Sequence, residues 1–178
     1  GELVPGAESW INLAFLRARE QLDGIQRRTR EVGEAEGVPV NDVPRPTDQF
    51  MNLNVFFQDY LPNNDNFRVH LNLSVGTGLP FGIKGNNVVY RNPYRYKPYH
   101  RVDIGFSFRL WSRLWEQARP KSFFRMTRDS WMSIEIFNLL QVRNEASRTW
   151  VKTIFKQQYA IPNYLTSRRI NLKFRFEF

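Results

Sequence analysis

The sequence holds few of the side chains that perform catalysis. Cysteine is absent, and the two histidines, His70 and His100, lie far apart in the chain. Disulfides, thiolate metal sites and cysteine nucleophiles are therefore excluded, and the histidines have no metal-ligand spacing. We find no Ser/His/Asp set in a recognisable local context, no phosphate-binding glycine loop and no paired carboxylates at an identifiable pocket. The sequence therefore predicts a protein that is not an enzyme, with no catalytic residue, metal site or cofactor.

Side chains suited to binding recur instead at every second position, between apolar neighbours. In residues 169–178 the even positions are Ile, Leu or Phe, and the odd positions are Arg, Asn, Lys or Glu. Residues 102–110 and 68–75 alternate in the same way. Because successive side chains of a strand point to opposite faces, this period predicts strands with one apolar and one polar face. Weaker alternation marks 51–58, 132–136 and 11–15.

We expect six strands within a single domain, residues 1–178. Their bounds are near 8–19, 47–60, 66–77, 100–111, 129–141 and 166–178. Each has about 10 to 14 residues, which suits a tilted membrane-spanning strand better than the roughly five or six residues usual in soluble sheets. The longest apolar run falls well short of the roughly 18 residues that a membrane-spanning helix needs. The predicted fold is all-β, an antiparallel transmembrane β-barrel segment.

The connections between these strands alternate in length. Long loops are expected at 20–46, 78–99 and 142–165, a tight turn at 61–65, and an intermediate connection with a short helix at 112–128. Outer-membrane barrels place short turns in the periplasm and long loops outside. Counting back from a periplasmic carboxyl terminus puts all three long loops outside, so the loop lengths and the strand pattern favour the same topology.

In such a barrel the polar parity faces the lumen, because a mid-strand Arg or Lys facing lipid costs roughly 2 to 4 kcal/mol. Two interpretations of these polar side chains stay open: they contact a ligand or the plug of the barrel, or they line a wet interior and pair with one another. The candidate lumen-facing residues are Asn52, Asn54, Gln58, Arg68, His70, Asn72, Asp103, Arg109, Glu135, Asn171, Lys173 and Arg175.

The loop at 78–99 interleaves aromatic and basic residues, a mixture that suits stacking on rings and pairing with phosphates. It is interpreted either as an external loop that contacts the ligand or lipopolysaccharide, or as a solvated structural loop. The net charge of +9 likewise favours an anionic neighbour, whether nucleic acid, lipid phosphate or an acidic ligand. The loop residues concerned are Tyr90, Arg91, Tyr94, Arg95, Tyr96, Lys97 and Tyr99.

A series of motifs carries a resemblance to a known family. They are PRPTDQ at 44–49, FFQDYLP at 56–62, GTGLPFG at 76–82, RVDIGFS at 101–107, IEIFNLL at 134–140 and YAIPNYLTSRRINL at 159–172. Their order and spacing resemble the carboxyl-terminal barrel segment of Bacteroidota TonB-dependent receptors, of the SusC/RagA-like or carboxypeptidase-regulatory-like-domain type. The resemblance implies a segment of a barrel of about 22 strands, which imports a nutrient across the cell outer membrane with energy from TonB.

The resemblance also implies partners. A companion chain is expected to carry the rest of the barrel and the plug and to contact TonB, with the break lying before Glu8. Outer-membrane lipid, lipopolysaccharide and a surface lipoprotein of the SusD type are further partners, and nucleic acid is not. The last strand resembles the signal that the barrel assembly machinery binds, and a simple hydrophobic edge strand is the alternative interpretation. The aromatic residues of that signal are Phe174, Phe176 and Phe178.

Other functions stay open. One is a structural or oligomeric outer-membrane barrel without active transport, and another is a soluble basic β-protein that binds nucleic acid. The substrate of a transporter is equally open among glycan, peptide and metal chelate. Four aromatic residues near strand ends fit either an interfacial girdle or packing inside the rims. They are Trp10, Tyr60, Trp111 and Trp131.

Overall fold

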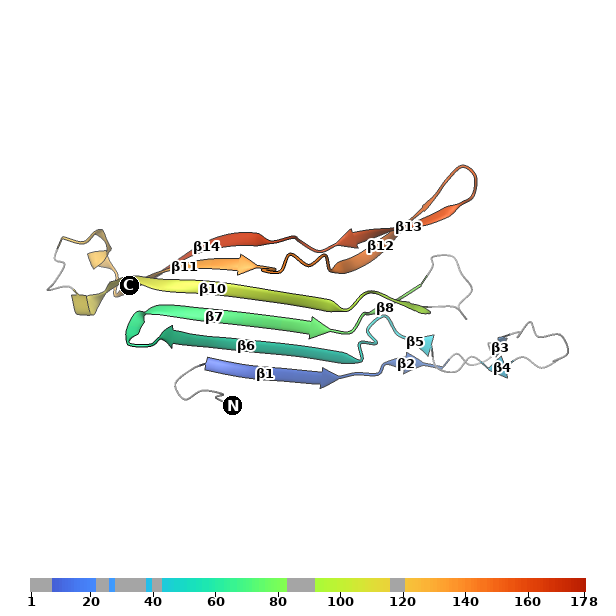
Figure 1. Cartoon of the computed structure of the whole chain (residues 1–178), viewed down its shortest axis with the longest axis horizontal. Coiled ribbons are helices and arrows are strands. Elements are labelled where there is room, and N and C mark those ends of the chain that lie inside the picture. Colours follow the sequence, from blue (N-terminus) through green and yellow to red (C-terminus); the bar gives the residue numbers. More distant parts are fainter. Residues whose placement is uncertain (1–7, 22–25, 28–37, 40–42, 83–91, 116–120) are drawn as a thin grey trace.

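A computed structural model describes residues 8–21, 26–27, 38–39, 43–82, 92–115 and 121–178. Its main element is a six-stranded antiparallel sheet, which confirms the all-β, antiparallel prediction. No helix among the described residues is long and apolar enough to cross a membrane. In spatial order (Figure 1) the strands are β1 (Glu8–Phe15), β6 (Met51–Leu61), β7 (Asn64–Gly76), β10 (Tyr99–Ser112), β11 (Asp129–Phe137) and β14 (Arg169–Glu177).

Cross-strand pairing keeps the two faces of this sheet chemically distinct. Val69 pairs with Phe106, and Phe106 pairs in turn with Ile134. One residue along, Arg68 pairs with Ser107. Because directly paired residues share a face, the alternation in each strand adds up to one apolar face and one polar face across the sheet. We use these two names below.

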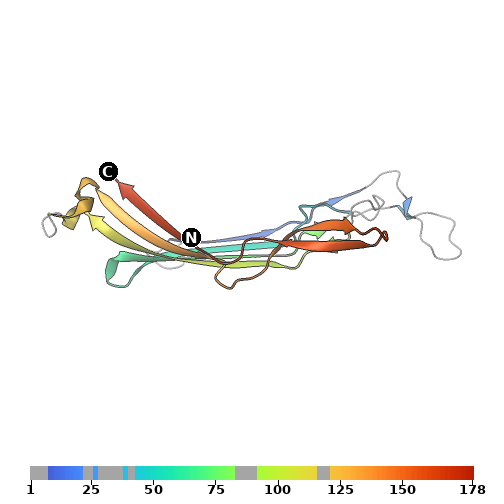
Figure 2. The ribbon, with the colours of Figure 1, turned by 90° about the horizontal axis from the view of Figure 1, so that it is seen from above.

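The sheet is curved and open. Its strands bend together along their length (Figure 2). Within the described residues, β1 and β14 form the two edges and do not pair with each other. Nearly every side chain of β14 is exposed. The outer edges of the sheet therefore present backbone N–H and C=O groups in positions that further strands would pair.

Short hairpins extend the sheet at one end, on the right of Figure 1. The expected loop 142–165 is largely a hairpin, so its description as a loop is corrected. Its residues carry no two-faced alternation, which is why the sequence pattern did not reveal strands there. The pairs are β2 (Arg19–Glu20) with β5 (Val43–Pro44), β3 (Gln26–Arg27) with β4 (Val38–Pro39), β8 (Pro80–Phe81) with β9 (Tyr94–Arg95), and β12 (Glu145–Lys152) with β13 (Gln158–Tyr164).

Asparagines join this end to the sheet. Asn138 has a positive φ of 53° and ends β11 earlier than the alternation predicted. Its backbone N–H donates to Asp103 Oδ1 at 2.7 Å. Asn144 accepts from the backbone N–H of His100 at 3.1 Å and donates to the carbonyl of His100 at 2.9 Å. These side chains satisfy backbone groups that the ladder leaves unpaired.

The opposite end carries the tight turn between β6 and β7, with Asn63 at a positive φ of 61°, and two 3-10 helices, η2 (Arg113–Trp115) and η3 (Phe123–Met126). The pairing of β10 with β11 shifts register between Arg109 and Trp111. Trp111 is only 1% exposed, and its indole N–H donates to the carbonyl of Thr127 at 3.1 Å. The described part of the intermediate connection therefore carries short 3-10 helices, where the sequence predicted a short helix.

Burial is confined mainly to these two ends. Among the described residues only three apolar side chains are buried, namely Val43, Phe81 and Trp111. Leu172 is 53% exposed and Ile11 is 54% exposed, although both belong to the apolar face. The described residues do not cover the apolar face, so this sheet has no hydrophobic core of its own.

Candidate functional site

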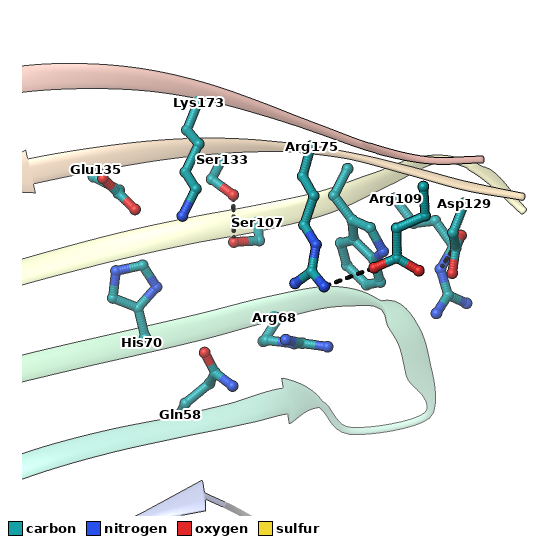
Figure 3. Close-up of a pocket in the computed structure, with 12 residues that line it drawn as sticks. Gln58, Arg68, His70, Ser107, Arg109, Asp129, Ser133, Glu135, Lys173 and Arg175 are labelled. Atoms are coloured by element: carbon teal, nitrogen blue, oxygen red, sulfur yellow. Dashed lines mark hydrogen bonds and ion pairs between the residues drawn. The ribbon is translucent and has the colours of Figure 1, made fainter. Parts of the chain in front are cut away.

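A hollow of about 320 Å³ lies on the polar face, towards the end that carries the β6–β7 turn (Figure 3). It brings together seven of the candidate lumen-facing residues, Gln58, Arg68, His70, Arg109, Glu135, Lys173 and Arg175. Five further residues line it, Ser107, Asp129, Trp131, Ser133 and Glu177. The hollow draws on five adjacent strands, because the alternation gives all of these side chains the same parity.

Trp131 lies between two guanidinium groups in this hollow. The Arg109 guanidinium carbon is 4.6 Å from the Trp131 ring, and that of Arg68 is 5.0 Å away. Arg68 also lies 4.6 Å over the Tyr60 ring and donates to the Tyr60 hydroxyl. Such cation–π contacts contribute about 0.5 to 2 kcal/mol each. The indole therefore positions the two arginines.

Most charges of the hollow are paired. Arg109 Nε lies 3.3 Å from Asp129 Oδ1, and Arg175 lies 2.7 Å from Glu177. Elsewhere Asn171 donates to Glu135 at 2.9 Å. Two cations have no carboxylate partner among the described residues: Arg68 bonds only to the Tyr60 hydroxyl, and Lys173 forms no hydrogen bond or ion pair with a described side chain. The hollow thus keeps positive charge that its own carboxylates do not neutralise.

Four directly paired residues cross the hollow in a row, with two hydroxyls in the middle and a cation on each side. Arg68 pairs with Ser107, Ser107 with Ser133, and Ser133 with Lys173. The two serine hydroxyls lie 2.8 Å apart and share a hydrogen bond. Figure 3 shows Lys173 on one side of this serine pair and Arg68 on the other. Two hydroxyls between two cations form a suitable site for an anionic group.

Three aromatic rings on the polar face adjoin the hollow, and we call them the aromatic row: Trp10, Phe56 and His70. Trp10 stacks on Phe56 with 5.8 Å between ring centroids, and Phe56 stacks on His70 with 6.4 Å. Trp10 is 46% exposed. His70 lies over Gly105, where a side chain would overlap its imidazole ring. Because His70 lines the hollow as well, the row and the hollow form one continuous surface.

The remaining candidates on the polar face lie outside the hollow. Asn54 donates to Asn52 at 2.7 Å, and Asn52 donates to Gln49 at 3.1 Å, so these amides pair with one another. Asp103 is buried, where it accepts from Arg101 and from the backbone of Asn138. Asn72 pairs directly with Phe56 in the aromatic row, and Asn171 is the partner of Glu135.

The basic and aromatic loop is used partly for packing. Tyr96 stacks on Phe81 with 4.5 Å between centroids, and Tyr94 lies 5.6 Å from the same ring. The Arg148 guanidinium carbon, from β12, lies 4.5 Å from the centroid of the Phe81 ring, so the two hairpins contact each other there. Lys97 is exposed and Tyr99 begins β10. Tyr90 and Arg91 lie outside the described residues.

Arg95 from this loop is an internal anchor. It donates to the Asp48 carboxylate, to the Asp48 carbonyl at 2.8 Å and to the Gly78 carbonyl at 3.1 Å. Asp48 is 1% exposed and also accepts from the Ala18 N–H at 2.8 Å. Burial raises the pKa of Asp48, but the Ala18 hydrogen bond and the charges of Arg95 and Arg19 lower it by more, so the net pKa lies below 3.8.

The residues of the expected assembly signal lie on the last strand and its end. Phe174 and Phe176 stack with 6.4 Å between centroids, and Phe124 of η3 stacks on Phe176 at 6.1 Å. Phe178 is 89% exposed at the chain end. Of the aromatic residues near strand ends, Trp111 is buried, whereas Trp10, Tyr60 and Trp131 belong to the polar face.

Sequence reasoning missed five lining residues of the hollow. Ser107, Ser133 and Glu177 share the polar parity of Arg109, Glu135 and Arg175, but parity does not say which polar residues line the hollow. Asp129 begins its strand, and Trp131 was interpreted as a rim or girdle residue. Among the described residues, no group of three or more His, Cys, Asp or Glu side chains is placed to hold a metal ion.

Comparisons with known proteins find no relative. No protein-family model matches the sequence, and neither a curated protein nor a solved structure matches it.

Proposed function

We propose that this chain is part of the wall of an outer-membrane β-barrel, the carboxyl-terminal segment of a TonB-dependent transporter that imports a nutrient. The observation that carries the proposal is the uncovered apolar face of the six-stranded sheet. Only three apolar side chains are buried among the described residues, while side chains such as Phe106 and Leu172 stay about half exposed. Lipid is the environment in which such a face is stable.

The polar face supports the same proposal. Its cations and carboxylates would be costly in hydrocarbon, and they gather on the side opposite to the apolar face. In a barrel they line a wet lumen through which a ligand passes. The assignment to the TonB-dependent class, with its plug and TonB partner, rests on the motif resemblance alone. A barrel without active transport has the same wall, so it stays the second candidate.

The proposal requires strands beyond those in this sheet. Inside hydrocarbon each unpaired backbone group costs several kcal/mol, so the edges at β1 and β14 need partners. We expect a companion polypeptide, or further sequence outside these residues, to supply the remaining strands and the plug. The assembled barrel is then the functional unit, and the barrel assembly machinery inserts it.

Cysteine labelling tests the proposal at single-residue resolution, because the sequence has no native cysteine. Leu71, Asn72, Leu73 and Ser74 are replaced one at a time by cysteine in cells that produce the protein. We expect lipid-soluble maleimide fluorophores to show an apolar environment at 71 and 73. Water-soluble maleimide should react at 72 and 74 once the outer membrane is permeabilised.

Each position in this series is the matched control of its neighbour, because the side chains alternate between the faces. Uniform labelling by the water-soluble reagent, together with recovery of the protein in buffer without detergent, would refute the membrane assignment. Uptake of a nutrient that stops when TonB is deleted separates the transporter from a barrel without active transport.

A further inference from the structure

The serine pair of the hollow has a cationic side chain next to each of its hydroxyls. Ser107 Oγ and Ser133 Oγ lie 2.8 Å apart. Arg68 is the direct cross-strand partner of Ser107, and Lys173 is that of Ser133. Because adjacent strands lie about 4.8 Å apart, each cation is attached one strand away from its serine. A small anion above the two hydroxyls therefore lies between the two cationic side chains.

The serine pair keeps one hydroxyl hydrogen for a ligand. A serine hydroxyl has a single hydrogen to donate and can also accept, and either serine can be the donor in this pair. The hydrogen of the donor lies between the two oxygens, so the hydrogen of the other serine is left over. Among the described residues, neither side chain forms another hydrogen bond. The leftover hydrogen can therefore be donated to an anion above the pair.

Towards the β6–β7 turn, arginines separate the serine pair from the nearest carboxylates. The next paired row holds Arg109 and Arg175, and the row beyond it holds Asp129 and Glu177. Each of these carboxylates forms an ion pair with one arginine, at 3.3 Å for Arg109 and 2.7 Å for Arg175. The cations are thus nearer to the serine pair than the carboxylates are, which favours an anion there.

On the other side of the serine pair lies a single carboxylate, Glu135, two residues from Ser133 along β11. Glu135 accepts a hydrogen bond from Asn171 at 2.9 Å and forms no ion pair with a described residue. One carboxylate cannot neutralise both Arg68 and Lys173, which have no carboxylate partner in the described part of the chain. An anion between these two cations therefore gains electrostatic attraction.

We propose that the hollow binds a phosphate group, as the free ion or on a small ester, over the Ser107–Ser133 pair and between Arg68 and Lys173. The group accepts the leftover hydroxyl hydrogen and charge-assisted hydrogen bonds from both cations. Its charge, about −1.5 to −2 at neutral pH, balances two cations, and its oxygens accept from several directions. The inference deepens the proposed function, since it names the ligand class of the lumen-facing wall. It rests on that function only for the route by which the ligand arrives.

A ligand panel tests this chemistry on the protein as purified from cells, with any companion chain. Isothermal titration calorimetry compares inorganic phosphate and glucose 6-phosphate with neutral glucose and with acetate. We expect at least one phosphate compound to bind about tenfold or more tightly than both controls, because glucose has no charge and acetate has only one. Tighter binding of the free ion identifies phosphate itself as the ligand, and tighter binding of the ester identifies a phosphorylated small molecule. Equal affinity across the panel, or no binding of either phosphate compound, overturns the inference.

Charge variants locate the site. Lys173→Gln and Arg68→Gln should each weaken phosphate binding about tenfold, because each removes a charge-assisted hydrogen bond. Arg68→Lys should recover part of the loss. Arg169→Gln is the matched control, since Arg169 is exposed, shares the strand and the face of Lys173 and lies outside the hollow. The control should change affinity by less than about twofold. Equal losses in Lys173→Gln and Arg169→Gln would mean a general attraction to the positive face and would refute the site.

The serine pair provides a test that a general attraction cannot pass. Ser107→Ala or Ser133→Ala alone should weaken phosphate binding less than about threefold, because the remaining hydroxyl still has its hydrogen to donate. The double variant should weaken binding about tenfold, because no hydroxyl is left. Single variants that lose as much as the double variant, or a double variant that loses nothing, would refute the serine pair as the binding site.

The two proposals fail in distinguishable ways. Phosphate binding by a protein that is recovered in buffer and shows no lipid labelling supports the anion site and refutes the membrane wall. Alternating lipid labelling in a protein that binds neither phosphate compound supports the wall and refutes the anion site.

Discussion

The six-stranded sheet and the hairpin end obtain their stability from different sources. We define the hairpin end as residues 45–49 with β2, β5, β8, β9, β12 and β13. There Asp48 is buried and bonded to Ala18 and Arg95, and Phe81 is buried beneath Tyr96. The middle of the sheet has paired backbone but leaves its apolar face exposed. The hairpin end thus finds its contacts within the chain, whereas the described residues leave the apolar face of the sheet uncovered.

This difference predicts where a substitution acts. Under the proposed membrane location, an apolar side chain of the sheet contributes through transfer out of water into lipid. At the hairpin end, Asp48 contributes through fixed hydrogen bonds and ion pairs within the chain, and its effect is local. Substitutions in the two regions should therefore respond differently to membrane insertion and to pH.

The largest effect is expected from substitutions that remove the apolar side chains at the last strand of the sheet. Replacing Phe174, Phe176 and Phe178 together by Ser should greatly reduce the amount of protein assembled in the outer membrane. Each ring contributes about 1.5 to 3 kcal/mol when it is removed from water, and the strand also loses its expected assembly signal. Membrane fractionation with a heat-modifiability gel measures assembly.

The matched variant replaces Lys173, Arg175 and Glu177 by Ser on the polar face of the same strand. It should assemble nearly as well as the wild type, because these side chains are expected to meet water. Normal assembly of the aromatic variant would remove the targeting role. A loss of assembly in both variants would show that the strand, rather than its apolar face, is what matters.

A smaller effect is expected at the hairpin end from Asp48→Asn. The variant should lower the free energy of local opening at Ala18 and in residues 92–96, and so raise hydrogen exchange there. The full loss would be about 1 to 3 kcal/mol, and the partial exposure of Arg95 reduces it. The lowered pKa of Asp48 means that its contribution is present above 3.8 and is lost as the pH falls through the folded-state value. Hydrogen exchange with mass spectrometry should therefore show wild type and variant converging only below pH 3.8. A difference that shrinks at neutral pH would contradict this account.

The sequence predicted the sheet well because each strand has a different environment on each side, and period two records it. It did not predict β12 and β13, since Glu145 to Lys152 contains no such contrast. Parity alone also could not select the hollow. Which residues become neighbours depends on register, including the shift between Arg109 and Trp111. The role of Arg95 depends on Asp48, which is distant in sequence, so no local pattern reveals it.

The smallest expected effect on stability is at the contact between Gly105 and His70 within the sheet. A Cβ at position 105 would overlap the imidazole ring, which is a side chain that can rotate rather than fixed backbone. Gly105→Ala should therefore cost about 0.5 to 1.5 kcal/mol, the cost of forcing His70 from its preferred rotamer. In a His70→Ala background the same substitution should cost much less, because no ring remains to be displaced. A double-mutant cycle on urea unfolding of the detergent-solubilised assembly measures the difference as a coupling energy. A coupling of about 0.5 kcal/mol or more means that side-chain packing on the polar face stabilises the middle of the sheet. A coupling near zero means that the sheet depends on its environment alone and that His70 is free to leave the aromatic row.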